Sequence, residues 1–250
     1  MRVIPVAGLS GSGKTTFIRS LVPLLARLGP VGTVKHTGHH SMELPEGKDT
    51  TVMFGAGAAA VAGVDREKTL VTLGSSSLAG ALDLLADRGM AFAVVEGFKD
   101  SPLPKIVTGD ADLEGCILRN PSPGDVIPAL DRFPNYFSLG GILRELGGEA
   151  GGDRIPPALS CAALPLPGGM DGEALDRLEQ ELPGLVEGCG DQPGVIGIRA
   201  VLQRGALFGK ADGLLFGAAA RSGEAATATL ARMISESRRM LGQQGTRPRP

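Results

Sequence analysis

Short apolar runs alternate with longer segments of helical spacing through the first 145 residues. The continuous run Ala91–Val95 is typical of a strand buried on both faces. Leu78, Leu82 and Leu85 recur on one side of a predicted helix. The pattern predicts strands at 3–7, 31–35, 59–64, 70–73, 91–95, 105–107 and 116–118, and helices at 15–28, 51–58 and 77–88. Strands separated by helices indicate an α/β fold with a mostly parallel sheet flanked by helices.

The composition changes near residue 147, where glycine and proline become frequent. Gly147–Gly152 and Pro165–Gly169 are typical of a flexible connection. We therefore predict a domain at 1–147, a Gly/Pro-rich linker at 148–169, and a smaller C-terminal α/β module at 170–242. The module's pattern predicts helices at 172–182 and 224–241, a strand at 195–202, and a strand with a turn at 207–216. We expect residues 243–250 to be a disordered tail.

A phosphate-binding loop lies between the first predicted strand and the first predicted helix. Residues 8–15 read GLSGSGKT, which matches G-x-x-x-x-G-K-[ST]. Glycines allow backbone N–H groups to turn toward a phosphate, and the start of the following helix adds the positive end of its dipole. Lys14 is expected to reach the β- and γ-phosphates, and the Thr15 hydroxyl to ligate Mg²⁺. The predicted nucleotide contacts are Gly8, Ser10, Gly11, Ser12, Gly13, Lys14, Thr15 and Thr16.

A carboxylate follows the central apolar strand, where a P-loop protein needs a second acidic group. Glu96 comes directly after Ala91–Val95, and Gly97 leaves room for a γ-phosphate. We expect Glu96 to hold Mg²⁺ together with Thr15 and to take part in hydrolysis. The alternative is that Glu96 only caps the turn that follows the strand.

Two further segments place charged side chains near strand ends. All three histidines fall within Lys35–His40, at positions 36, 39 and 40. This cluster indicates an anion or nucleotide site with Lys35 and His36, a metal site, or a solvated loop. Lys99 and Lys105 flank a proline-containing turn and are candidates for binding a second phosphate-bearing ligand. Asp49 is a candidate for orienting the Mg²⁺ shell or the attacking water, or for capping the next helix.

The signal for base recognition is weak. Guanine-specific P-loop proteins often use [NT]-K-x-D, and Gly209-Lys210-Ala211-Asp212 lacks the first residue. Asn120, after the predicted strand at 116–118, is a second candidate.

Composition excludes several classes of protein. A net charge of −2 gives no electrostatic reason to expect nucleic acid or an anionic membrane as a partner. No apolar run is long enough for a membrane span, and the start of the chain lacks the pattern of a signal peptide. Three widely spaced cysteines suggest neither a disulfide framework nor a zinc ribbon, so a reducing cytoplasm is expected.

Together these motifs resemble the MobB family, the molybdopterin-guanine dinucleotide biosynthesis protein B. The resemblance covers about residues 1–145. It is carried by Gly8–Thr16, Val34–Thr37 with His39, Gly47–Asp49, Gly55–Ala58, and Val94–Lys99 with Pro104–Ile106. It implies a homodimeric GTP-binding P-loop protein with Mg²⁺ and weak GTPase activity. It also implies an accessory role beside the guanylyltransferase that joins GMP to molybdopterin, with molybdopterin itself a candidate ligand. By position, Lys14, Thr15 and Glu96 would bind nucleotide and Mg²⁺, and Lys35, His36, Asp49, Lys99 and Lys105 would line the adjoining cleft.

Residues 150–250 extend beyond the usual end of the family. Some members are fused to a domain like the large subunit of molybdopterin synthase, but that domain's basic pattern is not evident here. Lys210, Arg199 and Arg204 form only a thin basic set. Two alternatives to the adaptor hypothesis stay open. One is a GTPase-type metal chaperone that uses His36, His39 and His40, and the other is a P-loop small-molecule kinase.

Overall fold

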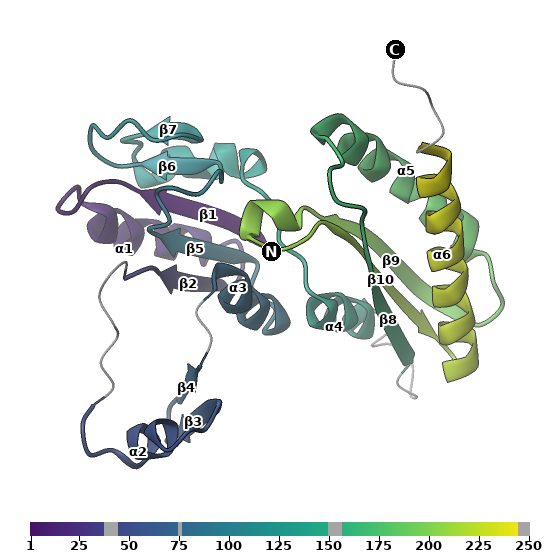
Figure 1. The fold of residues 1–250 in the computed structure, drawn as a ribbon, viewed down its shortest axis with the longest axis horizontal. Helices are drawn as coiled ribbons and strands as arrows, with labels where there is room; N and C mark the ends of the chain where they lie inside the picture. The colour runs from purple at the N-terminus through teal and green to yellow at the C-terminus, as the bar shows by residue number, and fades with distance from the viewer. Residues whose placement is uncertain (38–44, 75–76, 150–156, 245–250) are drawn as a thin grey trace.

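The computed structural model describes residues 1–37, 45–74, 77–149 and 157–244. Its N-terminal part is built on a five-stranded parallel sheet in the order β2-β5-β1-β6-β7 (Figure 1). The strands are β1 (Arg2–Ala7), β2 (Val31–Lys35), β5 (Phe92–Glu96), β6 (Lys105–Val107) and β7 (Cys116–Arg119). The predicted fold class is confirmed, because all five strands run in the same direction and helices cover both faces of the sheet.

Alternate residues of the central strands face two different helical layers. Ile4 and Val94 pack with α1 (Lys14–Leu25) and the 3₁₀ helix η1 (Pro123–Arg132). Val3 and Val95 pack on the opposite face with α3 (Leu78–Asp87). All four residues are fully or almost fully buried, which explains why the central positions of both strands are apolar on either face.

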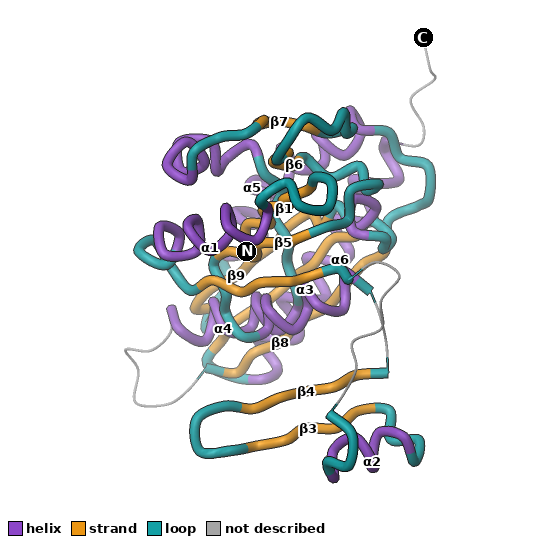
Figure 2. The backbone as a smooth tube through the Cα atoms, turned by 90° about the vertical axis from the view of Figure 1, so that its left-hand side faces the viewer, coloured by secondary structure: helices purple, strands orange, loops and turns teal. Residues whose placement is uncertain are grey.

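The segment between β2 and α3 forms a small unit of its own. It contains α2 (Asp49–Gly55) and the antiparallel hairpin of β3 (Ala60–Val64) and β4 (Thr69–Leu73). In Figures 1 and 2 this unit lies apart from the parallel sheet, at the lower end of each view. Val61 is buried and Gly63 approaches Thr50, so α2 covers one face of the hairpin.

The C-terminal part is built on a three-stranded antiparallel sheet in the order β8-β10-β9. The strands are β8 (Ala158–Pro165), β9 (Val195–Gln203) and β10 (Gly213–Ala220). Leu214 and Phe216 of β10 face α5 (Gly172–Gly190) and α6 (Gly223–Gln244), whereas Leu215 and Ala219 face α4 (Leu139–Glu149). Figure 1 shows α4 between the two sheets, with α5 and α6 on the far side.

The two sheets are joined by a packed junction. The short 3₁₀ helix η2 (Gly205–Phe208) leaves the C-terminal sheet and buries Phe208 in the core between α3 and the parallel sheet. Phe208 meets the ring of Tyr136 edge-on, with ring centroids 5.0 Å apart. Tyr136 precedes α4, which lies in the segment that leads from one sheet to the other, so η2 packs against the start of that segment.

The structure corrects three predicted boundaries. The predicted linker at 148–169 contains β8, which pairs with β10 along its whole length, so a linker does not hold for Ala158–Pro165. The first helix ends at Leu25, three residues before the predicted end at Leu28, although turn-type hydrogen bonds continue to Gly29. The last helix reaches Gln244, which shortens the predicted tail; residues 245–250 lie outside the described residues. The division into domains stays a prediction. Across the described ranges, no helix is long and apolar enough to cross a membrane.

Candidate functional site

The P-loop connects the carboxyl end of β1 to α1, as its motif predicts. Gly8, Gly11 and Gly13 have φ values of 152°, 78° and 84°, a region that side chains resist. A Cβ at Gly8 would also lie 2.4 Å from the carbonyl oxygen of Thr108. The Lys14 ammonium folds back on the loop and donates to the carbonyl oxygens of Gly8 at 3.1 Å and Leu9 at 2.6 Å. A bound phosphate would offer this ammonium a charged acceptor in place of two neutral ones.

Glu96 ends β5, the strand beside β1, and meets the P-loop there. The Thr15 hydroxyl lies 3.3 Å and 3.4 Å from the two Glu96 carboxylate oxygens. The Lys35 ammonium, at the end of β2, lies 3.7 Å from the same carboxylate. The carboxylate is 14% exposed and the Lys35 side chain 62%, so the lysine is free to approach a ligand from solvent. A hydroxyl and a carboxylate are the oxygen ligands that Mg²⁺ prefers, so this pair fits the ion chemically.

His36 and Phe98 form the wall beyond Glu96. Their rings stack with centroids 4.4 Å apart and planes 18° from parallel. The backbone N–H of His36 donates to the Glu96 carbonyl oxygen at 2.9 Å, which keeps His36 aligned with the end of β5. Gly97 has a φ of 104°, and a Cβ there would lie 2.8 Å from His36 Cβ. The glycine after Glu96 is therefore required by the close approach of His36.

Sequence reasoning missed Thr108, which braces the P-loop from the other side. Its hydroxyl lies 2.8 Å from the Ser12 hydroxyl and 3.3 Å from the Ala7 carbonyl oxygen. Asn120 holds the next residue, because its amide oxygen accepts from the Gly109 N–H at 2.6 Å. Thr108 follows β6 directly, so its place at the carboxyl end of a strand was the available signal. Asn120 adopts a φ of 46° to make this contact beside the P-loop.

Lys105 does not line the cleft in this structure. Its side chain is fully buried on β6, and its ammonium donates to the carbonyl oxygens of Lys99 at 2.9 Å and Ser101 at 2.5 Å. Burial lowers the pKa of Lys105, while the carboxylates of Glu114 and Asp100 act in the opposite direction. Lys105 therefore fixes the loop after Glu96 from inside, whereas Lys99 in that loop is exposed.

Other predicted site residues lie away from the P-loop or outside the description. Asp49 is the first residue of α2, in the unit that Figure 1 shows apart from the parallel sheet, and Lys48 holds the N-cap position. Lys210 and Asp212 are used at the junction, where Lys210 contacts Asp83 and Asp212 accepts from the Ala206 N–H. His39 and His40 of the predicted cluster lie outside the described residues. Among the residues that are described, no group of three or more His, Cys, Asp or Glu side chains is placed to hold a metal ion.

The similarities to known proteins lie in the N-terminal part of the chain, which contains the P-loop. Over 111 residues it is 39% identical to the molybdopterin-guanine dinucleotide biosynthesis adapter protein of Haemophilus influenzae, covering 42% of this chain and 61% of that protein. Over 112 residues it is 35% identical to the adapter protein of Escherichia coli, covering 42% and 63%. The chain thus spans less than two thirds of the length of these relatives.

A solved structure of Bacillus subtilis MobB aligns with a TM-score of 0.43 and 24% identity, over 54% of this chain and 99% of that one. The model of the family described as molybdopterin guanine dinucleotide synthesis protein B matches residues 3–120. This range contains the P-loop, Glu96 and Asn120 and ends before α4. Residues 3–120 of this chain therefore match the MobB family model and are similar to the adapter proteins of that family.

Proposed function

We propose that this chain is a GTP-binding adaptor of molybdopterin-guanine dinucleotide biosynthesis in the cytoplasm, with weak Mg²⁺-dependent GTPase activity. The observation that carries the proposal is the meeting of the P-loop with the end of β5, where Thr15 and Glu96 oxygens lie within 3.4 Å. In this proposal Lys14 contacts the phosphates of the nucleotide, and the Thr15 hydroxyl and the Glu96 carboxylate bind Mg²⁺. The biosynthetic pathway is inferred from the relatives, which are named molybdopterin-guanine dinucleotide biosynthesis adapter proteins.

Calorimetric titration with GTP and with ATP, each with Mg²⁺, tests nucleotide choice. We expect GTP to bind more tightly, and Lys14→Ala to weaken binding by at least about tenfold, since a charged phosphate contact is lost. Lys68→Ala, an exposed lysine in the turn between β3 and β4, is the matched control and should leave binding unchanged. Equal or tighter binding of ATP would refute the guanine assignment.

The metal assignment has its own test. Thr15→Val and Glu96→Gln each remove one oxygen ligand but keep the shape of the side chain. We expect both variants to bind GTP similarly with and without Mg²⁺, whereas the wild-type protein gains affinity and slow hydrolysis with the ion. If both variants keep the full effect of Mg²⁺, the ion is held elsewhere.

We infer that a second copy of this chain covers the hairpin β3–β4. Its uncovered face carries Val64, Val71 and Leu73, which are 77%, 46% and 38% exposed. The opposite face rests on α2, and a two-stranded hairpin is marginally stable without a covering layer. Val71→Asp should convert a dimer into a monomer in light scattering, while Val52→Asp, on the exposed side of α2, is the control for a merely local effect.

The adaptor role requires a partner, for which the guanylyltransferase of the pathway is the candidate, with molybdopterin as a possible shared ligand of the Lys35–His36 cleft. Co-purification of the full chain with that enzyme in the presence of GTP is the expected result. Lys35→Ala should leave GTP binding near normal if the cleft serves the second ligand. Failure of the wild-type chain to associate with the enzyme under any nucleotide condition would refute the adaptor role.

A further inference from the structure

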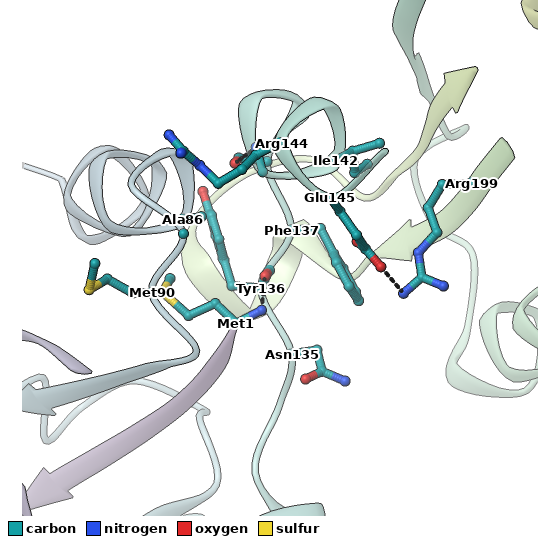
Figure 3. Close-up of a pocket in the computed structure, with 13 residues that line it drawn as sticks. Met1, Ala86, Met90, Asn135, Tyr136, Phe137, Ile142, Arg144, Glu145 and Arg199 are labelled. Atoms are coloured by element: carbon teal, nitrogen blue, oxygen red, sulfur yellow. Dashed lines mark hydrogen bonds and ion pairs between the residues drawn. The ribbon is translucent and has the colours of Figure 1, made fainter. Parts of the chain in front are cut away.

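A cavity of about 460 Å³ opens between the two sheets, at the end of β1 opposite the P-loop. Its walls come from Met1, the turn before β5, residues 135–138, α4 and β9 (Figure 3). Because β1 has six residues, this cavity lies about 20 Å from the P-loop. Its volume is within the usual range for sites that bind small molecules, and such sites are common where two modules meet.

The walls are shaped by the close approach of α4 to the end of α3. A Cβ at Gly140 would lie 2.4 Å from Asp87 Oδ1, and one at Gly89 would lie 2.9 Å from Arg144 Cδ. With glycine at both positions, the Arg144 guanidinium reaches the Asp87 carbonyl oxygen through Nε at 3.2 Å and Nη2 at 2.6 Å. The Ser138 hydroxyl donates to the Asp87 carboxylate at 2.6 Å. Hydrogen bonds between elements therefore hold this wall in place.

The lining combines an apolar interior with a charged side. Met1, Met90, Phe137 and Ile142 supply side chains without charge, and Figure 3 shows Phe137 between the two methionines and Arg199. Arg199 of β9 pairs with Glu145 of α4 at 3.2 Å, and both side chains are almost half exposed. This pair engages one guanidinium nitrogen, and a guanidinium carries five N–H donors, so Arg199 can receive an anion in addition to Glu145.

We propose that this cavity is a second ligand site, for a small molecule that carries a flat apolar ring and a phosphate or carboxylate group. The ring lies against Phe137 and the methionines, and the anionic group contacts Arg199. Since the walls come from both sheets, the ligand bridges the P-loop module and the C-terminal module. The proposal does not depend on which nucleotide the P-loop binds.

Methionine-methyl NMR tests the location directly, with 1-naphthyl phosphate as the anionic probe and 1-naphthol as its neutral counterpart. We expect 1-naphthyl phosphate to shift the Met1 and Met90 methyl signals, and to leave Met53 on α2 and Met233 in the C-terminal core unchanged. 1-Naphthol should bind more weakly. If Met1 and Met90 do not respond to millimolar 1-naphthyl phosphate, the proposal is wrong.

Charge variants separate a ligand contact from a merely structural ion pair. Arg199→Gln should weaken 1-naphthyl phosphate binding about tenfold, with Arg199→Lys recovering part of it. Glu145→Gln should tighten binding about threefold, because it removes a competing carboxylate. A structural pair would instead make both variants weaker. Arg238→Gln on the exposed side of α6 is the matched control and should have no effect.

The P-loop also binds phosphates, so the probe is measured in the Lys14→Ala variant as well. We expect Lys14→Ala to weaken GTP binding at least about tenfold, as above, and to keep the Met1 and Met90 shifts. If Lys14→Ala removes those shifts too, the probe occupies the P-loop and the second site is refuted. Loss of GTP binding alone bears on the proposed nucleotide function, and loss of the methionine shifts alone bears on this cavity.

Discussion

The Tyr136 hydroxyl is the centre of the junction, and its removal tests how the two sheets are held together. It lies 2.8 Å from Asp83 Oδ1 and 3.1 Å from the Ala79 carbonyl oxygen, and it accepts from the Lys210 ammonium at 2.9 Å. Its single proton serves the closer, charged acceptor on Asp83. Asp83 belongs to α3 and Lys210 to the turn between η2 and β10, so this hydroxyl connects three segments.

We expect Tyr136→Phe to lower the free energy of unfolding by about 2 kcal/mol. The ring keeps its packing against Phe208, so the main loss is the hydrogen bond that the hydroxyl donates to Asp83, worth about 1.5–3 kcal/mol. Asp83 still contacts Lys210 in this variant and is not left without a partner. Lys210→Met should cost less, about 0–1 kcal/mol, because the Lys210–Asp83 pair is about 40% exposed.

The same contacts give a pH dependence with a definite sign. Burial raises the pKa of Tyr136 above its usual value of 10.0, and the hydrogen bond to Asp83 adds to the effect. Above pH 10 the unfolded chain therefore loses its tyrosine proton while the folded chain keeps it. Stability is fully present below pH 10 and then falls with rising pH, with this group contributing at most about 1.4 kcal/mol per pH unit.

Tyr136 is the only tyrosine and the chain has no tryptophan, so ultraviolet absorbance of tyrosinate reports this residue alone. We expect no titration near pH 10 in the folded protein and normal titration in urea. Urea unfolding followed by circular dichroism at pH 7 to 11 should show the loss of stability in the wild type and a smaller loss in Tyr136→Phe. A folded-state titration at pH 10 would refute the reasoning.

Three further changes test other parts of the structure. Lys105→Met removes the donor shared by two loop carbonyl oxygens, and we expect it to lower the unfolding free energy by about 2 kcal/mol in urea titrations; unchanged stability would show that the loop after Glu96 does not need this ammonium. Gly217→Ala places a Cβ 2.4 Å from Ile142 Cγ2, so it should cost about 1–3 kcal/mol, while Gly168→Ala, with open space around it, should cost little. Gly8→Ala combines a φ of 152° with a close contact to a backbone oxygen. Calorimetry should show that the free energy of GTP binding decreases by more than the free energy of unfolding. A variant that binds GTP normally would contradict the assigned loop geometry.

The parallel sheet and the centre of the site could be predicted because their signals are local. The motif at 8–15 lies between a strand and a helix within a single stretch of sequence, and Glu96 follows the continuous apolar run Ala91–Val95. The carboxyl ends of neighbouring parallel strands meet at one edge, which is enough to bring Glu96 to Thr15. Lys105 shows the limit of this reasoning, since a lysine beside a predicted site gives no sign of whether its ammonium faces a ligand or a backbone carbonyl.

The junction could not be predicted, because the residues that form it are far apart in the sequence and none of them indicates a contact between the two sheets. Asp83 and Lys210 are 127 positions apart; Asp83 reads as an ordinary surface charge, and Lys210 stands out only as part of a weak match to a guanine-binding motif. The predicted linker failed for a related reason: Gly and Pro lie before β8 and from its last residue, Pro165, onward, but none interrupts the seven residues 158–164. Antiparallel pairing with β10 supplies the order that the composition of the segment does not suggest. α4 packs between the two sheets, and η2 inserts Phe208 into the core of the first, so a ligand in the junction cavity would contact both modules. The Tyr136→Phe variant should therefore alter the affinity for that ligand while leaving the P-loop contacts in place.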